Sequence, residues 1–251
     1  MQDSIYTIPV SEAFEKDCEC PICELKSRFE NDTVQYYVGP SLMEPDNRIE
    51  TNKTGFCGRH FSLMYNTQAN RLGIGLVLDT YMQEQIKNIE KASKSKRIST
   101  KNAFLKNILK KDNTSAEEKT DALVSYLERH EKECCICKKL DYTMDRYIDI
   151  ILGLFFTENS FKERFVSGKG FCLPHLKILL SKAANNYGEA KYSEFAEAVI
   201  KMQIVNLDRI EKEVDWFTKK FDYRNQDVPW GNSRDALMRG INKMTGAEIR
   251  E

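Results

Sequence analysis

Apolar residues recur at three- and four-residue steps along much of the chain, which is the period of an amphipathic α-helix. The longest such stripe runs from Tyr192 to Phe217, and another covers residues 138–156. The first half has a comparable stripe between Leu72 and Ile89. The sequence contains no convincing alternation of apolar and polar positions, which would indicate a strand. The pattern therefore predicts an all-α protein.

Turn and capping residues place the ends of some of these helices. Ser160 followed by Glu163 has the spacing of a capping box and predicts a short helix before residue 168. Pro174 suits the first turn of a further helix. Ser233 is expected to cap a last helix in the C-terminal tail.

All eight cysteines lie in four short clusters. The clusters are CECPIC with Cys18, Cys20 and Cys23, GFCGRH with Cys57, CCIC with Cys134, Cys135 and Cys137, and GFCLPH with Cys172. His60 and His175 complete two Gly-Phe-Cys-x-x-His motifs. Buried cysteines are common in protein cores, but core packing does not explain why every cysteine falls in a cluster.

The clusters recur in the same order and at nearly equal spacing, which predicts a tandem duplication. We expect residues 1–92 to form a first helical repeat and residues 115–222 a second. Residues 93–114 would form a basic connector between them. Residues 223–251 would form a tail that packs on the core or serves in recognition.

A Cys-x2-Cys pair brought opposite a Cys-x2-His pair offers three thiolates and one imidazole, which is a tetrahedral shell that suits zinc. The predicted ligands are Cys20, Cys23, Cys57 and His60 in the first repeat and Cys134, Cys137, Cys172 and His175 in the second. We expect each repeat to close its own Cys3His site, so that two Zn²⁺ ions act as cofactors. An exchange of pairs between the repeats stays open, as does iron in place of zinc.

The surroundings of these ligands fit a metal site. Each pair precedes or opens a predicted helix, whose N-terminal amides would stabilise thiolates. The glycine of each Gly-Phe-Cys motif would let the backbone turn tightly, and the phenylalanine would shield the site.

Cys18 and Cys135 exceed what two four-ligand sites need. We expect them to be buried thiols or to lie beside the ligands. The alternative is a redox- or metal-responsive switch, in which a spare thiol displaces a ligand on oxidation.

Charge gives little indication of a partner, because 38 Lys and Arg balance 38 Asp and Glu. Only the stretch from Lys87 to Lys111 is strongly basic, with nine Lys or Arg against Glu90. This stretch would bind nucleic acid or, in our preferred interpretation, form a solvated connector. In the tail, Arg224 and Trp230 suit either a recognition patch or packing on the core.

No stretch approaches the 18 apolar residues that span a membrane, and the N-terminus does not resemble an export signal. We therefore expect a cytoplasmic protein without membrane contact. In a reducing cytosol, clustered thiols serve metal binding more often than disulfides.

Several motifs are similar to those of a known bacterial family. They are YTIPVSEAF, ECPICEL, MEPDNRIETNKTGFCGRHF, GKGFCLPH and FDYRN followed by PWG. They resemble a bacterial family that is known only as a domain of unknown function, and the resemblance covers nearly the whole chain. It implies a cytoplasmic bacterial protein and supplies no activity.

Enzyme motifs such as a Walker loop, HExxH or GxSxG are absent from the sequence. A catalytic zinc usually keeps one position for water, whereas each site here has four apparent ligands. We therefore favour a non-enzymatic interaction or regulatory scaffold with an unknown protein partner. A zinc enzyme is the alternative, if one site loses a ligand.

Overall fold

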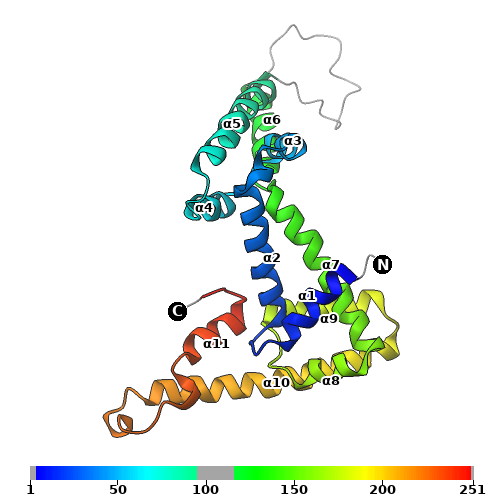
Figure 1. The fold of residues 1–251 in the computed structure, drawn as a ribbon, viewed down its shortest axis with the longest axis vertical. Helices are drawn as coiled ribbons and strands as arrows, with labels where there is room; N and C mark the ends of the chain where they lie inside the picture. Colours follow the sequence, from blue (N-terminus) through cyan, green and yellow to red (C-terminus); the bar gives the residue numbers. More distant parts are fainter. Residues whose placement is uncertain (1–3, 95–115, 250–251) are drawn as a thin grey trace. The chain divides into compact units, whose positions relative to one another are not determined.

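The computed structural model describes residues 4–94 and 116–249. Within these ranges the chain is built from helices, and no strand occurs in them (Figure 1). The predicted all-α fold class is therefore confirmed for this part of the chain. None of its helices is long and apolar enough to cross a lipid bilayer.

The chain divides into two compact units that do not follow the order of the sequence. Unit 1 consists of residues 1–29 and 142–251, and unit 2 consists of residues 30–141. The boundary falls within two helices, α2 and α7. The units differ from the predicted repeats 1–92 and 115–222, and the duplication itself stays a prediction. The predicted connector falls almost wholly outside the described residues.

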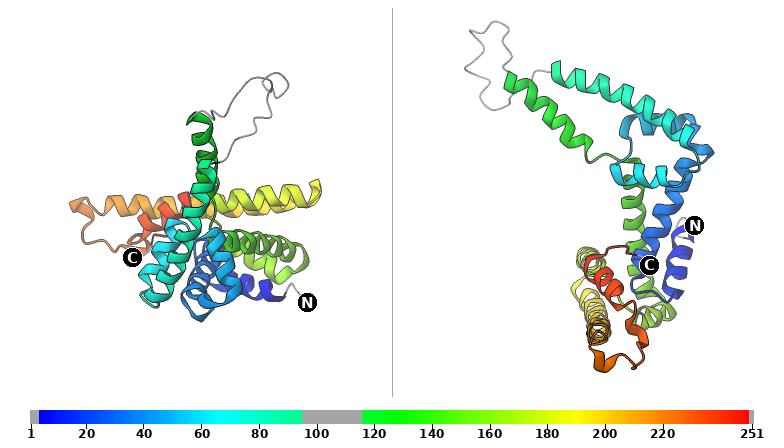
Figure 2. Two further views of the ribbon diagram at one scale, coloured as in Figure 1. Left: turned by 90° about the horizontal axis from the view of Figure 1, so that it is seen from above. Right: turned by 90° about the vertical axis from the view of Figure 1, so that its left-hand side faces the viewer.

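Unit 1 is organised around its longest helix, α10. Its elements are α1 (Ser4–Glu15), the start of α2 (Pro21–Val38), the end of α7 (Cys135–Thr157), α8 (Asn159–Ser167), α9 (Leu173–Asn186), α10 (Glu189–Lys219), the 3-10 helices η2 (Tyr223–Asn225) and η3 (Gly231–Ser233), and α11 (Ala236–Thr245). Helices α8, α9 and α11 all pack against α10. Figure 2 shows α11 beside α10.

The core of unit 1 is a cluster of phenylalanine rings. The ring centroid of Phe165 lies 5.1 Å from that of Phe155 and 5.3 Å from that of Phe171. Phe14 and Phe195 pack on Phe165 as well, each at 5.7 Å. Each buried ring removes a large apolar area from water. Because Phe171 directly precedes a ligand cysteine, this core also fixes one loop of a candidate metal site.

Unit 2 contains the remaining helices. They are the end of α2, η1 (Pro40–Met43), α3 (Pro45–Thr54), α4 (Gly58–Asn66), α5 (Arg71–Lys94), α6 (Ala116–His130) and the start of α7. Helix α5 contacts α3, α4 and α6. The core includes Tyr37, Phe56, Met64, Val77 and Ile136. The cysteines at the start of α7 belong to this core, so the second candidate site is part of the packing.

The apolar stripes predicted the long helices correctly. The stripes from Leu72 to Ile89, over residues 138–156 and from Tyr192 to Phe217 lie in α5, α7 and α10. Pro174 occupies the first turn of α9, as predicted.

Two predicted caps are wrong. Helix α8 begins at Asn159, because the extended backbone that an N-cap needs falls at Glu158, and Ser160 is already helical. Ser233 lies in η3, where its hydroxyl donates to the carbonyl of Trp230. Helix α11 begins only after Asp235.

Candidate metal centres

The eight predicted ligands converge in two groups of four. Site 1 consists of Cys20, Cys23, Cys172 and His175, and site 2 consists of Cys57, His60, Cys134 and Cys137. In each group all ligand atoms lie within 4.8 Å of one another. Site 1 belongs to unit 1 and site 2 to unit 2. Our expectation that each repeat closes its own site is therefore wrong, because each site joins the Cys-x2-Cys of one half to the Cys-x2-His of the other.

The helices that follow the cysteine pairs explain this exchange. Helix α2 has 18 residues and α7 has 23. At 1.5 Å per residue they carry the chain about 27 Å and about 35 Å away from the pairs at their N-termini. The Cys-x2-His motif that comes next in the sequence belongs to the other unit than the Cys-x2-Cys pair of its own half. A partner from the other half completes each site.

All four ligand pairs lie at helix N-termini, as predicted. Cys57 and Cys172 are the N-cap residues of α4 and α9. Cys20 and Cys134 immediately precede α2 and α7. In each case the second ligand is the third residue of the helix. Side chains at the N-cap and at this third position reach each other, as in a capping box, which accounts for the two-residue spacing within each pair.

The spacing of the ligand atoms at site 1 matches a tetrahedral zinc shell. Bonds of about 2.3 Å to sulfur and about 2.0 Å to nitrogen give tetrahedron edges of about 3.8 Å between sulfurs and about 3.5 Å between sulfur and nitrogen. The Cys172 sulfur lies 3.9 Å from that of Cys20 and 3.6 Å from that of Cys23. The Nδ1 nitrogen of His175 lies 3.1–3.5 Å from the three sulfurs.

Site 2 has the same geometry. The sulfurs of Cys57 and Cys137 lie 3.9 Å apart. The Nδ1 nitrogen of His60 lies 3.2 Å from the sulfurs of Cys57 and Cys134 and 3.4 Å from that of Cys137. The backbone N–H of Cys137 also donates to the Cys134 sulfur, with N and S 3.5 Å apart. This is the amide stabilisation that the sequence predicted.

Sulfurs at these distances repel one another when they are ionised. Burial and the charges of Cys134 and Cys57 raise the pKa of Cys137 to about 12. The hydrogen bonds of Cys23 with Cys172 and Cys20, together with burial, likewise raise the pKa of Cys23. A divalent ion removes this penalty because it compensates the charge of the thiolates. The donor sets therefore fit Zn²⁺ well.

The glycines of the two Gly-Phe-Cys motifs are required by the backbone. Gly55 has a φ of +61° and Gly170 a φ of +80°. A Cβ atom at Gly55 would stand 2.2 Å from the Tyr81 ring. Phe56 and Phe171 are buried beside the sites. These roles were predicted from the sequence.

The second ring nitrogen of His60, Nε2, contacts a residue whose role the sequence did not reveal. The Nε2 nitrogen of His60 lies 3.0 Å from Oε1 of Glu30. Arg59 donates two hydrogen bonds to the same carboxylate, at 2.9 and 2.6 Å. Although burial alone would raise the pKa of Glu30, the hydrogen bonds and charge of Arg59 and His60 hold it below its usual value. The ionised carboxylate accepts a hydrogen bond from Nε2–H and leaves Nδ1 free to bind a metal.

Site 1 is supported differently. The side-chain amide of Gln203 accepts from the N–H of Phe171 and donates to its carbonyl, at 2.9 and 2.8 Å. The buried ammonium of Lys243 donates to the carbonyl of Glu19 at 2.6 Å and also to that of Lys169. Lys243 thus ties the loop before Cys20 to the loop before Cys172. No local sequence signal marks Glu30, Gln203 or Lys243, because each acts on a loop distant in sequence.

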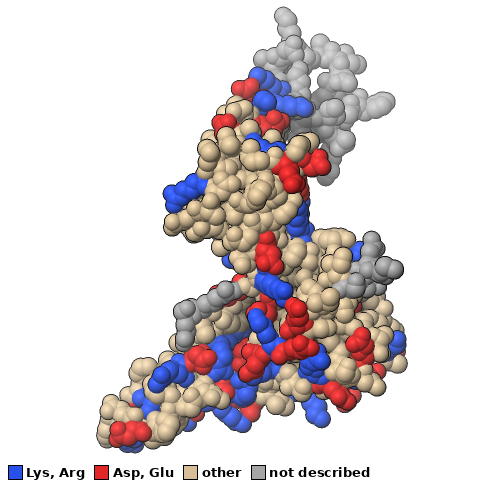
Figure 3. Space-filling view, viewed as in Figure 1, with Lys and Arg blue, Asp and Glu red and all other residues tan. Residues whose placement is uncertain are grey.

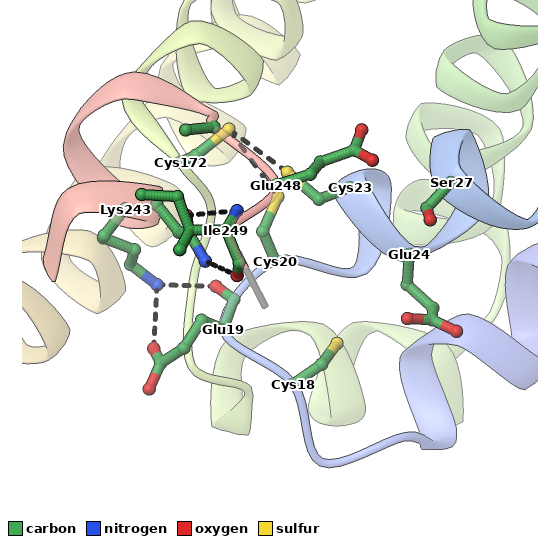
Figure 4. Close-up of a pocket in the computed structure, with 12 residues that line it drawn as sticks. Cys18, Glu19, Cys20, Cys23, Glu24, Ser27, Cys172, Lys243, Glu248 and Ile249 are labelled. Carbon is green, nitrogen blue, oxygen red and sulfur yellow. Dashed lines mark hydrogen bonds and ion pairs between the residues drawn. The ribbon is translucent and has the colours of Figure 1, made fainter. Parts of the chain in front are cut away.

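The two remaining cysteines stand outside the ligand groups. Cys135 is buried in unit 2, with its sulfur 3.2 Å from the Thr54 hydroxyl. Cys18 lines a pocket beside site 1, and Figure 4 shows its sulfur apart from the three sulfurs of that site. Burial raises the pKa of both thiols to about 11. At neutral pH they are protonated and therefore slow to react with oxidants, which gives the predicted redox switch no support.

The two candidate recognition residues of the tail contact residues at the end of α10 or just after it. The exposed Arg224 pairs with Asp222, with Nε and Oδ1 3.0 Å apart. The Trp230 ring packs against Phe217, with centroids 5.9 Å apart, and the Lys220 ammonium lies 5.2 Å from the Trp230 ring centroid. Neither residue belongs to a candidate metal site.

Comparison with known proteins gives a family and no activity. No curated protein and no solved structure matches the chain. A family described as a "Family of unknown function (DUF6062)" matches residues 1–251. The resemblance found in the sequence motifs is thereby confirmed, and the chain belongs to this family of unknown function, DUF6062.

Proposed function

We propose that this protein is a non-enzymatic helical scaffold that binds two zinc ions in structural Cys3His sites. The observation that carries the proposal is the spacing of the ligand atoms, which corresponds to a tetrahedral shell at both sites. Each site also joins helices that are distant in the sequence. A metal in such a position stabilises the tertiary fold directly.

The ligand number favours structure over catalysis. Four protein ligands fill a tetrahedral shell, whereas a catalytic zinc keeps a position for water or substrate. Structural zinc sites contribute about 10–16 kcal/mol of apparent binding free energy in small zinc peptides. A contribution of this size is enough to hold together units whose segments lie far apart in the chain.

A protein partner in the cytoplasm is part of this proposal. Helix α5 exposes a row of apolar side chains, and apolar surface of this kind is typical of protein-binding surfaces. The row consists of Leu72, Leu76, Leu78, Met82, Ile86 and Ile89. Figure 3 shows few charged side chains over α4 and the middle of α5 on the face that it presents. Nucleic-acid binding through residues 87–111 stays a prediction, because most of that stretch lies outside the described residues.

Elemental analysis of protein purified without added metal tests the proposal. We expect two equivalents of zinc per chain. The neighbouring residues Cys134 and Cys135 give a matched pair of variants. Cys134→Ser should lower the content to about one equivalent, because it removes a ligand of site 2. Cys135→Ser should retain both ions, because its thiol contacts Thr54 instead.

Two results would contradict the proposal. A protein that folds and carries no metal would rule out structural metal sites. Iron in place of zinc, together with visible absorption from thiolate-to-iron charge transfer, would replace the structural zinc by a redox-active centre.

A further inference from the structure

Site 1 opens onto a pocket. Three of its ligands, Cys20, Cys23 and Cys172, form part of the lining of a cavity of about 180 Å³ (Figure 4). The start of α2 and the segment that follows α11 provide most of the other lining residues. A cavity of this size holds several water molecules or the ligand arm of a small chelator. Solvent thus has a route to the sulfurs of this site.

The chain segment after α11 lies along this pocket and is fastened at its end. The side-chain amide of Asn242 donates to the carbonyl of Ile249 at 2.9 Å, and the N–H of Ile249 donates back to the Asn242 side chain at 3.1 Å. Glu248 and Lys26 form an ion pair at 3.5 Å. Both Asn242 and Ile249 line the pocket. Because these contacts are few and exposed, local opening of the segment costs little free energy.

The acids in the lining of this pocket are all ion-paired. Glu19 pairs with Arg209 and Arg239, Glu24 with Lys16, and Glu248 with Lys26. The ammonium of Lys243, the one basic residue in the lining, is bound by backbone carbonyls. The ligand sulfurs are therefore the groups in the pocket that would bind a divalent cation.

Site 2 differs in the support of its imidazole. His60 is 1% exposed, and Glu30 with Arg59 holds its outer nitrogen. At site 1, His175 is only partly buried, and its Nε2 has no hydrogen-bond partner within residues 4–94 and 116–249. Outer hydrogen bonds of this kind strengthen metal retention. Each site has two buried and two partly buried ligands, so the difference between the sites lies in the hydrogen bonding of the histidine.

We propose that site 1 is an exchangeable metal site, which accepts and releases its ion through this pocket, whereas site 2 retains its ion. The inference rests on the proposed function, since both sites must first bind zinc. On release, the ion passes to a competing acceptor with nitrogen, oxygen or sulfur ligands, and the freed thiolates take up protons from water. The Asn242–Ile249 contact controls the rate.

Competition with a colorimetric zinc chelator tests this on the full chain loaded with two ions. We expect two phases of one equivalent each, with the fast phase at least about tenfold faster than the slow one. Iodoacetamide added after the fast phase should label Cys20, Cys23 and Cys172, as read by mass spectrometry. Cys57, Cys134 and Cys137 should stay unlabelled. A single phase of two equivalents, or labelling of the site 2 cysteines first, would overturn the inference.

The pocket route has its own test. Asn242→Ala removes both hydrogen bonds to Ile249 and should accelerate the fast phase about tenfold while the slow phase is unchanged. Asn225→Ala is a matched control, because it removes an asparagine bond to the carbonyl of Lys219 away from the pocket. An unchanged fast phase in Asn242→Ala would refute the pocket route. A protein that binds fewer than two ions would instead refute the proposed function, before any kinetics are measured.

Discussion

The Nε2 nitrogen of His60 lies 3.0 Å from a carboxylate oxygen of Glu30 on α2. This contact decides which ring nitrogen faces the sulfurs of site 2, because a histidine that donates through one nitrogen binds metal through the other. Arg59 from the same Cys-x2-His motif completes the arrangement. Of the two residues that support His60, Arg59 is therefore adjacent to it in the sequence, whereas Glu30 lies on α2.

Replacement of Glu30 should weaken metal binding at site 2 alone. We expect Glu30→Gln to reduce the affinity of this site for zinc about 10- to 100-fold, because the imidazole loses its charged acceptor. Chelator competition on the purified variant measures the change. Asp32→Asn is the control, since Asp32 is an exposed acid on the same helix. Equal affinities in both variants would show that the Glu30 carboxylate does not support the metal.

The glycines of unit 2 offer a test of backbone strain. Gly55→Ala should lower the free energy of unfolding by at least about 2 kcal/mol, because it combines a left-handed conformation with a clash against Tyr81. Gly58→Ala, three residues further on, should be neutral or slightly stabilising, since its Cβ would meet no atom within 4 Å. Urea titration followed by circular dichroism compares the two. Similar losses in both variants would contradict the proposed strain at Gly55.

Lys243 should hold α11 to the loops of site 1. Its ammonium is buried and binds the carbonyls of Glu19 and Lys169. Lys243→Met leaves these carbonyls without their donor, and we expect hydrogen exchange in α11 to accelerate roughly 30- to 100-fold. Lys201→Met, at an exposed position of α10, is the control and should leave exchange in α11 unchanged. Slow exchange in α11 of the Lys243 variant would argue that apolar packing alone anchors this helix.

Double variants test the exchange of ligand pairs between the halves. Cys20→Ser combined with Cys172→Ser damages site 1 twice, so one zinc ion should remain after dialysis against a mild chelator. Cys20→Ser combined with Cys57→Ser damages both sites, so no ion should remain. If each half of the chain closed its own site, the two results would be reversed. The comparison needs only zinc analysis of two proteins with equal numbers of cysteines.

The sequence was sufficient to nominate all eight candidate ligands, and the reason is local. A two-residue gap between ligands suits the N-cap and third position of a helix, so each pair can be recognised without knowledge of the fold. The long helices were also predictable, because apolar residues recur at helical spacing along α5, α7 and α10. The first residues of the short helices α8 and α11 could not be predicted. Ser160 and Ser233 fit the capping pattern in the sequence but do not occupy the N-cap position in the structure.

The pairing of the ligands and their outer contacts depend on the fold. The Cys-x2-Cys of either half offers the same chemistry to Cys57 and His60, so composition cannot distinguish the two arrangements. The lengths of α2 and α7 decide between them. Glu30 reaches His60 only after the helices of unit 2 have packed, and no motif marks it in the sequence.

The exchanged pairing makes the two loops that the candidate metal sites would close nested. Cys57 and Cys137 are 80 positions apart, and this stretch lies wholly inside the 152 positions between Cys20 and Cys172. During synthesis the ribosome therefore delivers every ligand of the inner loop before the outer loop can close. At about 5 to 20 residues per second, the thiols of Cys20 and Cys23 wait roughly 8 to 30 s for their partners. The nascent chain thus carries Cys20 and Cys23 without their partners while the inner loop already has its full set of ligands.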